Sequence, residues 1–317
     1  MTLNDRAARR VEALLSRAEE RRVRVIEVPG GGRVVDCGVE AAGGLLAGLD
    51  LARICMADLA EIALVPGIVG DRSSPVVQVA TDHPVSSCLA SQYAGWQLAR
   101  GDFFAMGSGP MRAAWGGEAV FDAIGCREEA GAVVGVLEGR AIPTPEVMAL
   151  VAESCRVTPT AVTLLIAPTA SLAGGVQVVA RSVETGLHKL HELGFDLSRI
   201  VSAFGTAPLP PVAGDDLAAI GRTNDAILYG GRVVFDVTGD DDSLLEIGPK
   251  VPSSSSRDHG EPFAAVFSRY NHDFYAVDPH LFSPAEVVFR NLQTGRCFAF
   301  GRVEPEVLAR SFGTEAG

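Results

Sequence analysis

The stretch that decides the fold covers residues 167–194, APTASLAGGVQVVARSVETGLHKLHELG. It follows an apolar run at residues 162–167, which is typical of a buried strand. Pro168, Thr169 and Ser171 then supply a turn with hydroxyls that can cap a helix, and Gly194 is a helix stop signal. The pattern therefore predicts a strand that leads into one long helix.

This predicted helix carries two stripes of side chains. The apolar stripe repeats at steps of three and four residues and should face the core: Val176, Val179, Val183, Leu187 and Leu190. At about 100° per residue, a polar stripe lies beside it rather than opposite. Its members are Gln177, Arg181, Glu184, His188 and His191. A polar stripe next to a core face could form the wall of a pocket.

Arg181 and Glu184 are three residues apart, so their side chains can meet on one face of a helix. One interpretation is a solvated ion pair worth a few tenths of a kcal/mol. Another is a functional pair on a pocket wall. A third interpretation groups Glu184 with His188 and His191 as metal ligands, but no further Cys, His or Asp stands at a telling spacing.

Helices and strands are interleaved along the chain. A hairpin is expected around the PGGG turn at residues 29–32 and a second around residues 293–295, and residues 86–99 have helical spacing. Further strands are expected at 75–80, 131–138, 200–205 and 232–238, and helices at 145–156, 215–229 and 304–311. The hairpins imply antiparallel strands within an α/β chain, so the expected class is α/β with α+β mixed sheets.

A chain of 317 residues is long enough for two domains. The predicted division is 1–155 for an N-terminal α/β domain and 156–317 for a C-terminal α/β domain that carries the helix of Arg181 and Glu184. An apolar content of 47% supplies a sizeable core. The six cysteines are scattered without a CxxC spacing, which favours reduced, mostly buried thiols.

The composition also limits the kinds of partner that we expect for this protein. No apolar run approaches the ~20 residues that cross a bilayer, and the charged N-terminal segment lacks the apolar block of a signal peptide. We therefore expect a cytoplasmic protein with no membrane partner. A net charge of −12 without a basic patch argues against nucleic acid as a partner, because a phosphate backbone would be repelled.

Two loops have more than one interpretation. The GSGP turn at residues 107–110 could bring backbone amides to an anionic group, or it could be a plain turn. Residues 251–263, VPSSSSRDHGEPF, have the composition of a flexible linker, yet Arg257 and Asp258 could also shape the edge of a pocket.

Nine short blocks follow one another over nearly the whole chain: VVDCGVE, TDHP, SQYAGWQ, FFAMGSGP, APTAS, VQVVARSVET, GRTND, SRDHG and DPHLFSPA. In this order the sequence resembles the methenyltetrahydromethanopterin cyclohydrolase family of one-carbon metabolism in methanogens and methylotrophic bacteria. The resemblance implies a two-domain α/β subunit with a pocket between the domains, a homotrimer, and no metal or redox cofactor. A tetrahydromethanopterin derivative would be the substrate and one-carbon carrier.

The family's essential arginine and glutamate match Arg181 and Glu184 residue for residue, which favours the functional interpretation of the pair. One position departs from the family pattern, because Tyr93 stands where archaeal members tend to carry lysine. Recognition of the pterin's side chain should therefore differ here.

The resemblance implies a defined reaction. Water adds to a methenyl carbon held between two pterin-derived nitrogens, and one nitrogen then leaves to give 5-formyl-tetrahydromethanopterin. Our hypothesis is that Glu184 acts as general base and then general acid, while Arg181 orients it. Substrate contacts are expected from residues in blocks that match the family, each of which could equally serve as a cap or surface ion pair: Ser108, Arg112, Glu138, Thr169, Ser171, Asn224, Asp225 and Arg257.

Two other functions compete with this one. GSGP and the Gly174–Gly175 pair prompt a phosphoryl-transfer enzyme, but the chain lacks the GxxxxGK[ST] phosphate loop. A non-catalytic pterin-binding protein that carries one-carbon units is the second alternative. A pure carrier needs no proton-transfer group, so Arg181 and Glu184 argue against it.

Overall fold

The computed structural model describes residues 1–273 and 276–313, and within it the chain forms two compact units. The first unit combines Met1–Glu61 with Val85–Gln177, and the second combines Ile62–Pro84 with the chain from Val178 onward. The units therefore divide the chain at other places than the single cut predicted after residue 155. That cut, as a boundary between independently folding domains, stays a prediction.

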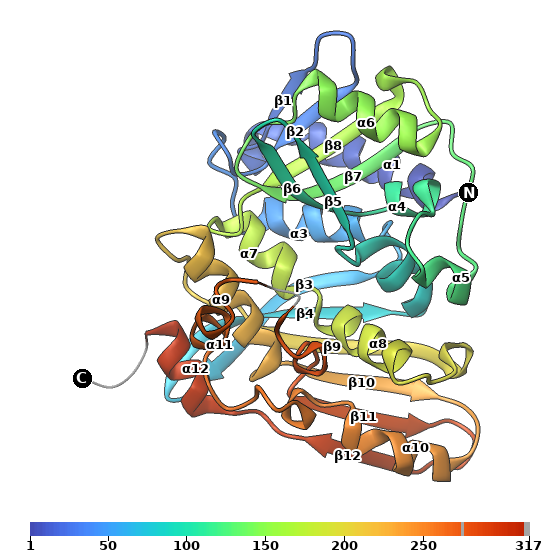
Figure 1. Cartoon of the computed structure of the whole chain (residues 1–317), viewed down its shortest axis with the longest axis vertical. Helices are drawn as coiled ribbons and strands as arrows, with labels where there is room; N and C mark the ends of the chain where they lie inside the picture. The colour runs from blue at the N-terminus through green and yellow to red at the C-terminus, as the bar shows by residue number, and fades with distance from the viewer. Residues whose placement is uncertain (274–275, 314–317) are drawn as a thin grey trace. The chain divides into compact units, whose positions relative to one another are not determined.

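The first unit is built on a mixed six-stranded sheet in the order β1-β2-β8-β7-β6-β5 (Figure 1). β8 runs parallel to both of its neighbours, β2 and β7, whereas the outer pairs are antiparallel. Its strands are β1 (Arg24–Glu27), β2 (Arg33–Asp36), β5 (Trp96–Arg100), β6 (Phe103–Ser108), β7 (Val133–Gly139) and β8 (Val162–Ala167). Its helices are α1 (Leu3–Leu15), α2 (Ala18–Arg21), α3 (Leu45–Cys55), a π-helix (Val85–Gln92), α4 (Met111–Trp115), α5 (Val120–Ile124) and α6 (Pro145–Cys155), and most of α7 (Leu172–Val179) follows.

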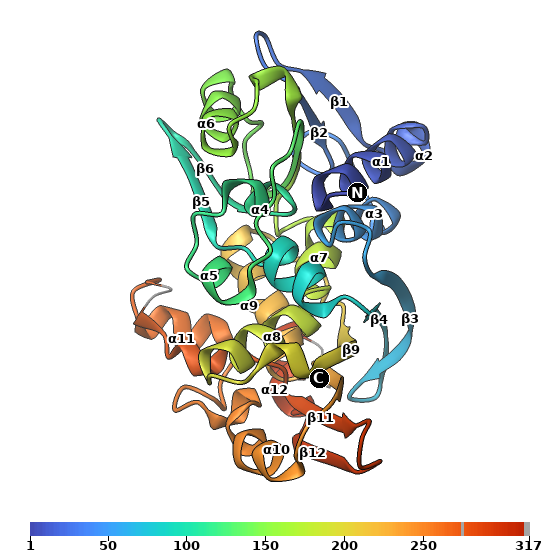
Figure 2. The same cartoon turned by 90° about the vertical axis from the view of Figure 1, so that its right-hand side faces the viewer.

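Both faces of this sheet are covered, as Figure 2 shows. Val34 and Leu164 belong to a core cluster shared with α6, whereas their neighbours Val35 and Leu165 belong to a cluster shared with α1 and α3. Successive strand residues point to opposite faces, so a strand with two apolar faces needs a layer on each side. This explains why the central strands read as continuous apolar runs.

The second unit holds another mixed six-stranded sheet, in the order β12-β11-β10-β9-β4-β3. β10 and β11 are parallel, and β10 and β9 are antiparallel. Its strands are β3 (Glu61–Val69), β4 (Arg72–Thr81), β9 (Ile200–Pro208), β10 (Arg232–Val237), β11 (Glu286–Asn291) and β12 (Cys297–Gly301). Its helices are α8 (Ser182–Glu192), α9 (Asp216–Leu228), α10 (Asp241–Ile247), α11 (Phe263–Arg269) and α12 (Pro305–Phe312).

α8 packs directly on the second sheet (Figure 1), and two glycines permit the close approach. A Cβ on Gly205 of β9 would lie 2.6 Å from Ser182 Oγ, and one on Gly186 of α8 would lie 3.0 Å from the ring of Phe235. Distances under 3.0 Å are not tolerated by a real Cβ, so the absence of a side chain at Gly205 allows the start of α8 to lie this close to the strand.

Most predicted elements are confirmed, including both hairpins, the strands near 75–80, 131–138, 200–205 and 232–238, and the helices near 145–156, 215–229 and 304–311. The mixed α/β class is confirmed as well. The helical prediction for 86–99 is wrong in its second half, because residues 96–100 form β5. The linker interpretation of 251–263 is also wrong, since Ser253, Ser256 and Asp258 are buried there.

The cysteine prediction is confirmed, because Cys37, Cys55, Cys88 and Cys155 are buried and all six thiols are free. Burial raises the pKa of the Cys155 thiol to about 12, which keeps it protonated near neutral pH. In the part of the chain that the structure describes, no helix is long and apolar enough to span a bilayer.

Candidate active site

Arg181 and Glu184 lie at the start of α8. The chain does not form the single long helix that the sequence predicts: α7 ends at Val179, and α8 begins at Ser182. Arg181 is the N-cap residue of α8, with φ −83° and ψ 8°, and Glu184 lies in its first turn. The amide of Arg181 donates to the carbonyl of Val178 (3.1 Å), and the Arg181 carbonyl accepts from the Thr185 amide (2.9 Å).

Local sequence weakens α7 but does not place the break, which falls at Ala180 and Arg181. α7 reads LAGGVQVV, in which two glycines and three valines lower helix propensity relative to alanine and leucine. The hydroxyl of Ser171 accepts a hydrogen bond from the amide of Gly174 (3.0 Å) and so caps the beginning of α7. The apolar stripe survives the break, because Val176, Val179 and Val183 are all fully buried.

Both side chains are buried where α8 begins. Only 6% of Arg181 and 4% of Glu184 are exposed, so the interpretation as a solvated surface pair is wrong. Glu184 also lies at the positive end of the α8 dipole, where a carboxylate is favoured. A buried carboxylate and guanidinium within one turn of a helix provide a proton acceptor and a group that can orient it.

The histidines of the predicted polar stripe are less buried than Arg181 and Glu184. His188 and His191 are only partly buried, and Nε2 of His188 lies 3.8 Å from a carboxylate oxygen of Glu192. Within residues 1–273 and 276–313, no three His, Cys, Asp or Glu side chains are placed to hold a metal ion. Glu184, His188 and His191 therefore do not form the metal site that their spacing allowed.

Two predicted substrate residues of the first unit contact each other. The hydroxyl of Thr169, which is 4% exposed, donates a hydrogen bond to the carboxylate of Glu138 at the end of β7. Ser171, partly buried, donates to the carbonyl of Pro168 (2.7 Å) as well as capping α7. The ends of the parallel strands β7 and β8 thus bring the carboxylate of Glu138 and the hydroxyl of Thr169 together, at the sheet edge where ligands commonly bind.

Ser108 and Arg112 are engaged inside the first unit. The hydroxyl of Ser108 donates to the carbonyl of Val136 (2.9 Å). Arg112 has no exposed surface; its guanidinium donates to the carbonyl of Leu89 (2.8 Å) and to the carboxylate of Glu118 (2.7 Å). Burial raises the pKa of the Glu118 carboxyl, although the charge of Arg112 opposes the rise. These hydrogen bonds hold Ser108 and Arg112 in place within the first unit. Their contacts with the substrate stay predictions.

The remaining predicted residues belong to the second unit. Asp225 is fully buried in α9 and accepts from the amide of Phe263 (2.8 Å). Asn224 is partly buried, and its side-chain amide donates to the carbonyl of Ile220 one turn earlier (2.8 Å). Arg257 is exposed, which leaves its guanidinium accessible to a ligand. The structure therefore joins Glu138 to Thr169, and it separately buries Arg181 and Glu184 at the start of α8.

Sequence reasoning missed Lys189. This residue of α8 is 1% exposed, and its ammonium donates to the carbonyl of His280 (2.6 Å) and to the hydroxyl of Ser255 (3.2 Å). Burial lowers its pKa to about 8, although the charge of Asp278 opposes the fall. Local sequence gives no warning of this, because a lysine near the end of a helix usually lies in solvent.

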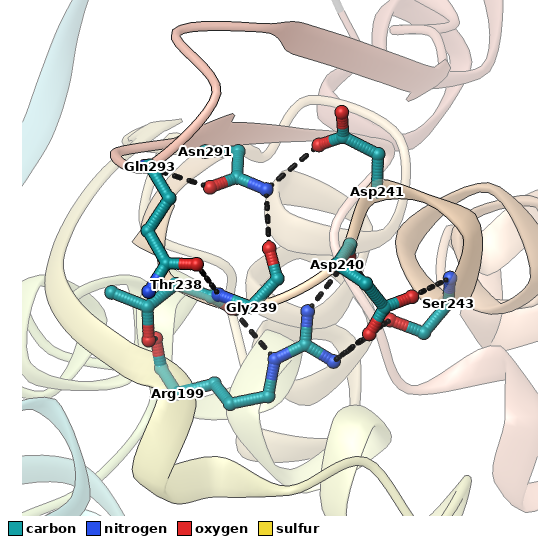
Figure 3. A network of polar contacts seen from close by, with 8 residues as sticks. All are labelled: Arg199, Thr238, Gly239, Asp240, Asp241, Ser243, Asn291 and Gln293. Atoms are coloured by element: carbon teal, nitrogen blue, oxygen red, sulfur yellow. Dashed lines mark hydrogen bonds and ion pairs between the residues drawn. The ribbon is translucent and has the colours of Figure 1, made fainter.

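A separate polar network stabilises the second sheet where β10 and β11 end (Figure 3). The guanidinium of Arg199 donates to the carbonyl of Thr238 (2.7 Å) and to the hydroxyl of Ser243 (2.8 Å). The side-chain amide of Asn291 donates to the carbonyl of Gly239 (2.8 Å). These bonds fix the turn that follows β10.

Beside this network is a cavity of about 530 Å³ that opens to solvent. Its charged lining residues are already paired, since Arg290 forms two hydrogen bonds with Asp236 (2.7 and 2.6 Å). None of the predicted catalytic or substrate residues lines it. The described residues that line it are Ser202, Asp236, Arg290, Asn291, Leu292, Gly295, Arg296 and Cys297.

Comparison with known proteins identifies the family of the chain. The family model described as "Cyclohydrolase (MCH)" matches residues 2–312. A methenyltetrahydromethanopterin cyclohydrolase from Rhodopirellula baltica is 50% identical over 288 residues, which cover 89% of this chain and 86% of the relative. Proteins of the same name from Methylobacterium sp. (strain 4-46) and Methanococcoides burtonii are 46% and 41% identical, and each alignment covers at least 97% of both chains.

The mixed α/β fold and these matches define the class as a cyclohydrolase, a hydrolase that acts on a cyclic C–N bond. Within that class, the chain belongs to the methenyltetrahydromethanopterin cyclohydrolase family.

Proposed function

We propose that this chain hydrolyses 5,10-methenyl-tetrahydromethanopterin, or its dephospho form, to the 5-formyl derivative, reversibly, with Glu184 as the proton-transfer group. The observation that carries the proposal is the burial of Glu184 and Arg181 together at the start of α8, in a chain whose relatives are named for this reaction. A buried carboxylate is costly unless it is paired and hydrogen-bonded, and the charged side chain of Arg181 lies three residues before it at the start of the same helix.

The proposed steps balance in atoms and charge. The Glu184 carboxylate accepts a proton as water oxygen bonds to the cationic methenyl carbon, which gives a neutral hydroxyl adduct. Glu184 then donates that proton to one bridging nitrogen as its bond to carbon breaks. The adduct hydroxyl becomes the formyl carbonyl and releases its proton to solvent. Hydrolysis of the cation thus yields one formyl product and one net proton.

Arg181 has a supporting role in this scheme. Its planar guanidinium can hold a carboxylate in one orientation through two parallel hydrogen bonds, a geometry that lysine cannot provide. Its N-cap position fixes its backbone relative to Glu184 because the Arg181 carbonyl accepts the first hydrogen bond of α8, from the amide of Thr185. Arg181 would also stabilise the oxygen that develops on the adduct.

Binding of the pterin is assigned to the other residues of the family blocks. Glu138 and Thr169 are the strongest of these because they share a hydrogen bond at the end of β7, and Ser171 follows Thr169 two residues later in the chain. Glu138 would attract the cationic methenyl group, and the hydroxyls would bind polar groups of the pterin. Arg257 is proposed to contact the substrate through its exposed guanidinium.

The test is the loss of the methenyl chromophore on addition of enzyme, followed by absorbance. Wild-type protein should consume it, and Glu184→Gln should lose turnover by about 10³-fold or more while it still binds the pterin. Glu192→Gln is the matched control, since Glu192 is an exposed glutamate of the same helix. A wild-type chain that binds the pterin without consuming it would instead be a one-carbon carrier.

The cellular setting follows the same proposal. Relatives come from Methylobacterium and from Methanococcoides, so we place the reaction in cytoplasmic one-carbon metabolism, as in formaldehyde oxidation or steps related to methanogenesis. The proposed assembly is a homotrimer without a prosthetic group. Sedimentation should then give a mass of about 100 kDa, three times 33.2 kDa.

A further inference from the structure

Lys189 is a buried cation that the proposed chemistry does not use. It lies on the same helix as Glu184, five positions further along, and is 1% exposed. Burying an ammonium is expensive, and a leucine or methionine would fill the same space without that cost. The two acceptors of Lys189 lie 66 and 91 residues away in the sequence, so its bonds organise distant segments rather than the helix itself.

Both acceptors lead to the segment that carries Arg257. The hydroxyl of Ser255, two residues before Arg257, accepts one bond from the Lys189 ammonium. The carbonyl of His280 accepts the other, and the amide of His280 donates to the carboxylate of Asp278 (3.1 Å).

The carboxylate of Asp278 connects these acceptors to the backbone of Arg257 through hydrogen bonds. The same carboxylate accepts from the hydroxyl of Ser256 (2.8 Å) and from the backbone amide of Arg257 (3.2 Å). A second carboxylate, Asp258, accepts from the amide of Asp278 (3.0 Å) and so joins the two segments in the opposite direction. The backbone of Arg257 is therefore attached on both sides to groups that lead back to Lys189.

From this network of hydrogen bonds we infer that Lys189 is a positioning residue. It holds the Arg257 segment in a fixed place relative to the helix that begins with Arg181 and Glu184. The inference rests on the proposed function, in which Arg257 contacts the pterin. Lys189 itself touches no reacting atom. Through Lys189, the helix α8 determines the position of the binding residue Arg257 as well as that of the proton-transfer group Glu184.

The decisive experiment is a double-mutant cycle of Lys189→Met and Arg257→Ala, measured on the full-length protein. Lys189→Met should raise KM for the methenyl pterin about tenfold with kcat changed less than about threefold, since a small misplacement of a binding group weakens affinity. In the Arg257→Ala background, Lys189→Met should have no further effect on KM, because residues of one network are not additive. Lys250→Met, at an exposed lysine, is the matched control.

Additive effects of the two substitutions, or an unchanged KM in Lys189→Met, would overturn the inference. If Lys189→Met does not fold, Ser255→Ala replaces it, because it removes one acceptor at an exposed residue. That variant should raise KM by about threefold in the wild-type background and leave it unchanged in Arg257→Ala. The same cycle in pterin Kd, obtained by titration, decides the inference even if the wild-type chain shows no turnover and the proposed function fails.

Discussion

The hydroxyl of Ser311 donates a 2.5 Å hydrogen bond to Oδ2 of Asp225, across 86 residues of sequence. The other oxygen of this carboxylate accepts from the amide of Phe263. One buried side chain thus ties α9 to α11 and to α12. Burial raises the pKa of Asp225 to about 7, although both hydrogen bonds oppose the rise.

This shift predicts how stability changes with pH. Because the folded state binds the proton more tightly than the unfolded state, the contribution of Asp225 is lost as pH rises from about 4 to about 7. The shift from 3.8 to about 7 corresponds to roughly 4 kcal/mol as an upper bound. Asp225→Asn should flatten this dependence, as measured by urea unfolding at pH 5 and pH 8. Equal slopes for wild type, Asp225→Asn and the exposed control Asp242→Asn would contradict it.

Close packing at Gly205 gives a second prediction. A Cβ there would approach Ser182 Oγ to 2.6 Å and a methyl of Val183 to 2.7 Å, so Gly205→Ala must push the start of α8 away from β9. We expect a loss of about 1–3 kcal/mol in the free energy of unfolding and a reduced kcat, because Glu184 moves with the helix. Gly214→Ala is the control, since nothing lies within 4 Å of its Cβ position. A Gly205→Ala variant with native stability would mean that the strand and helix separate freely.

Much of the fold could be predicted from the sequence because its signals are local. The alternation of apolar residues marks the strands, and the stripe from Val176 to Leu190 marks a buried helix face. The break at Ala180 and Arg181 escaped prediction because the spacing of that stripe continues across it. Periodicity records which side chains face the core, and it does not record whether each backbone bond between them is helical.

The contacts among the candidate site residues were predictable only in part, because many of them join distant parts of the chain. Arg181 and Glu184 lie three residues apart, so their proximity is visible in the sequence. The contact between Glu138 and Thr169 needs the pairing of β7 with β8, and the burial of Lys189 needs acceptors from two distant segments. Interactions of this kind depend on topology, which single-residue patterns do not contain.

The shape of the Arg181 side chain gives a third prediction. If it orients Glu184 through its planar fork, Arg181→Lys should lower kcat by about 10–100-fold with little change in KM, because a point charge does not fix the carboxylate plane. Steady-state kinetics on the methenyl pterin measure this, with Arg302→Lys as the exposed control. Full activity in Arg181→Lys would show that positive charge alone is sufficient.

The hydrogen bond between Thr169 and Glu138 gives the last prediction. Thr169→Val keeps the shape of the side chain but removes the donor, so the carboxylate of Glu138 loses a bond that holds it at the end of β7. A hydrogen bond to a charged group contributes about 1.5–3 kcal/mol, so we expect KM for the cationic substrate to rise about tenfold or more. Thr169→Ser restores the hydroxyl and should restore KM. A KM that is unchanged in Thr169→Val, or a Thr169→Ser variant that binds no better than Thr169→Val, would show that this hydrogen bond does not govern binding.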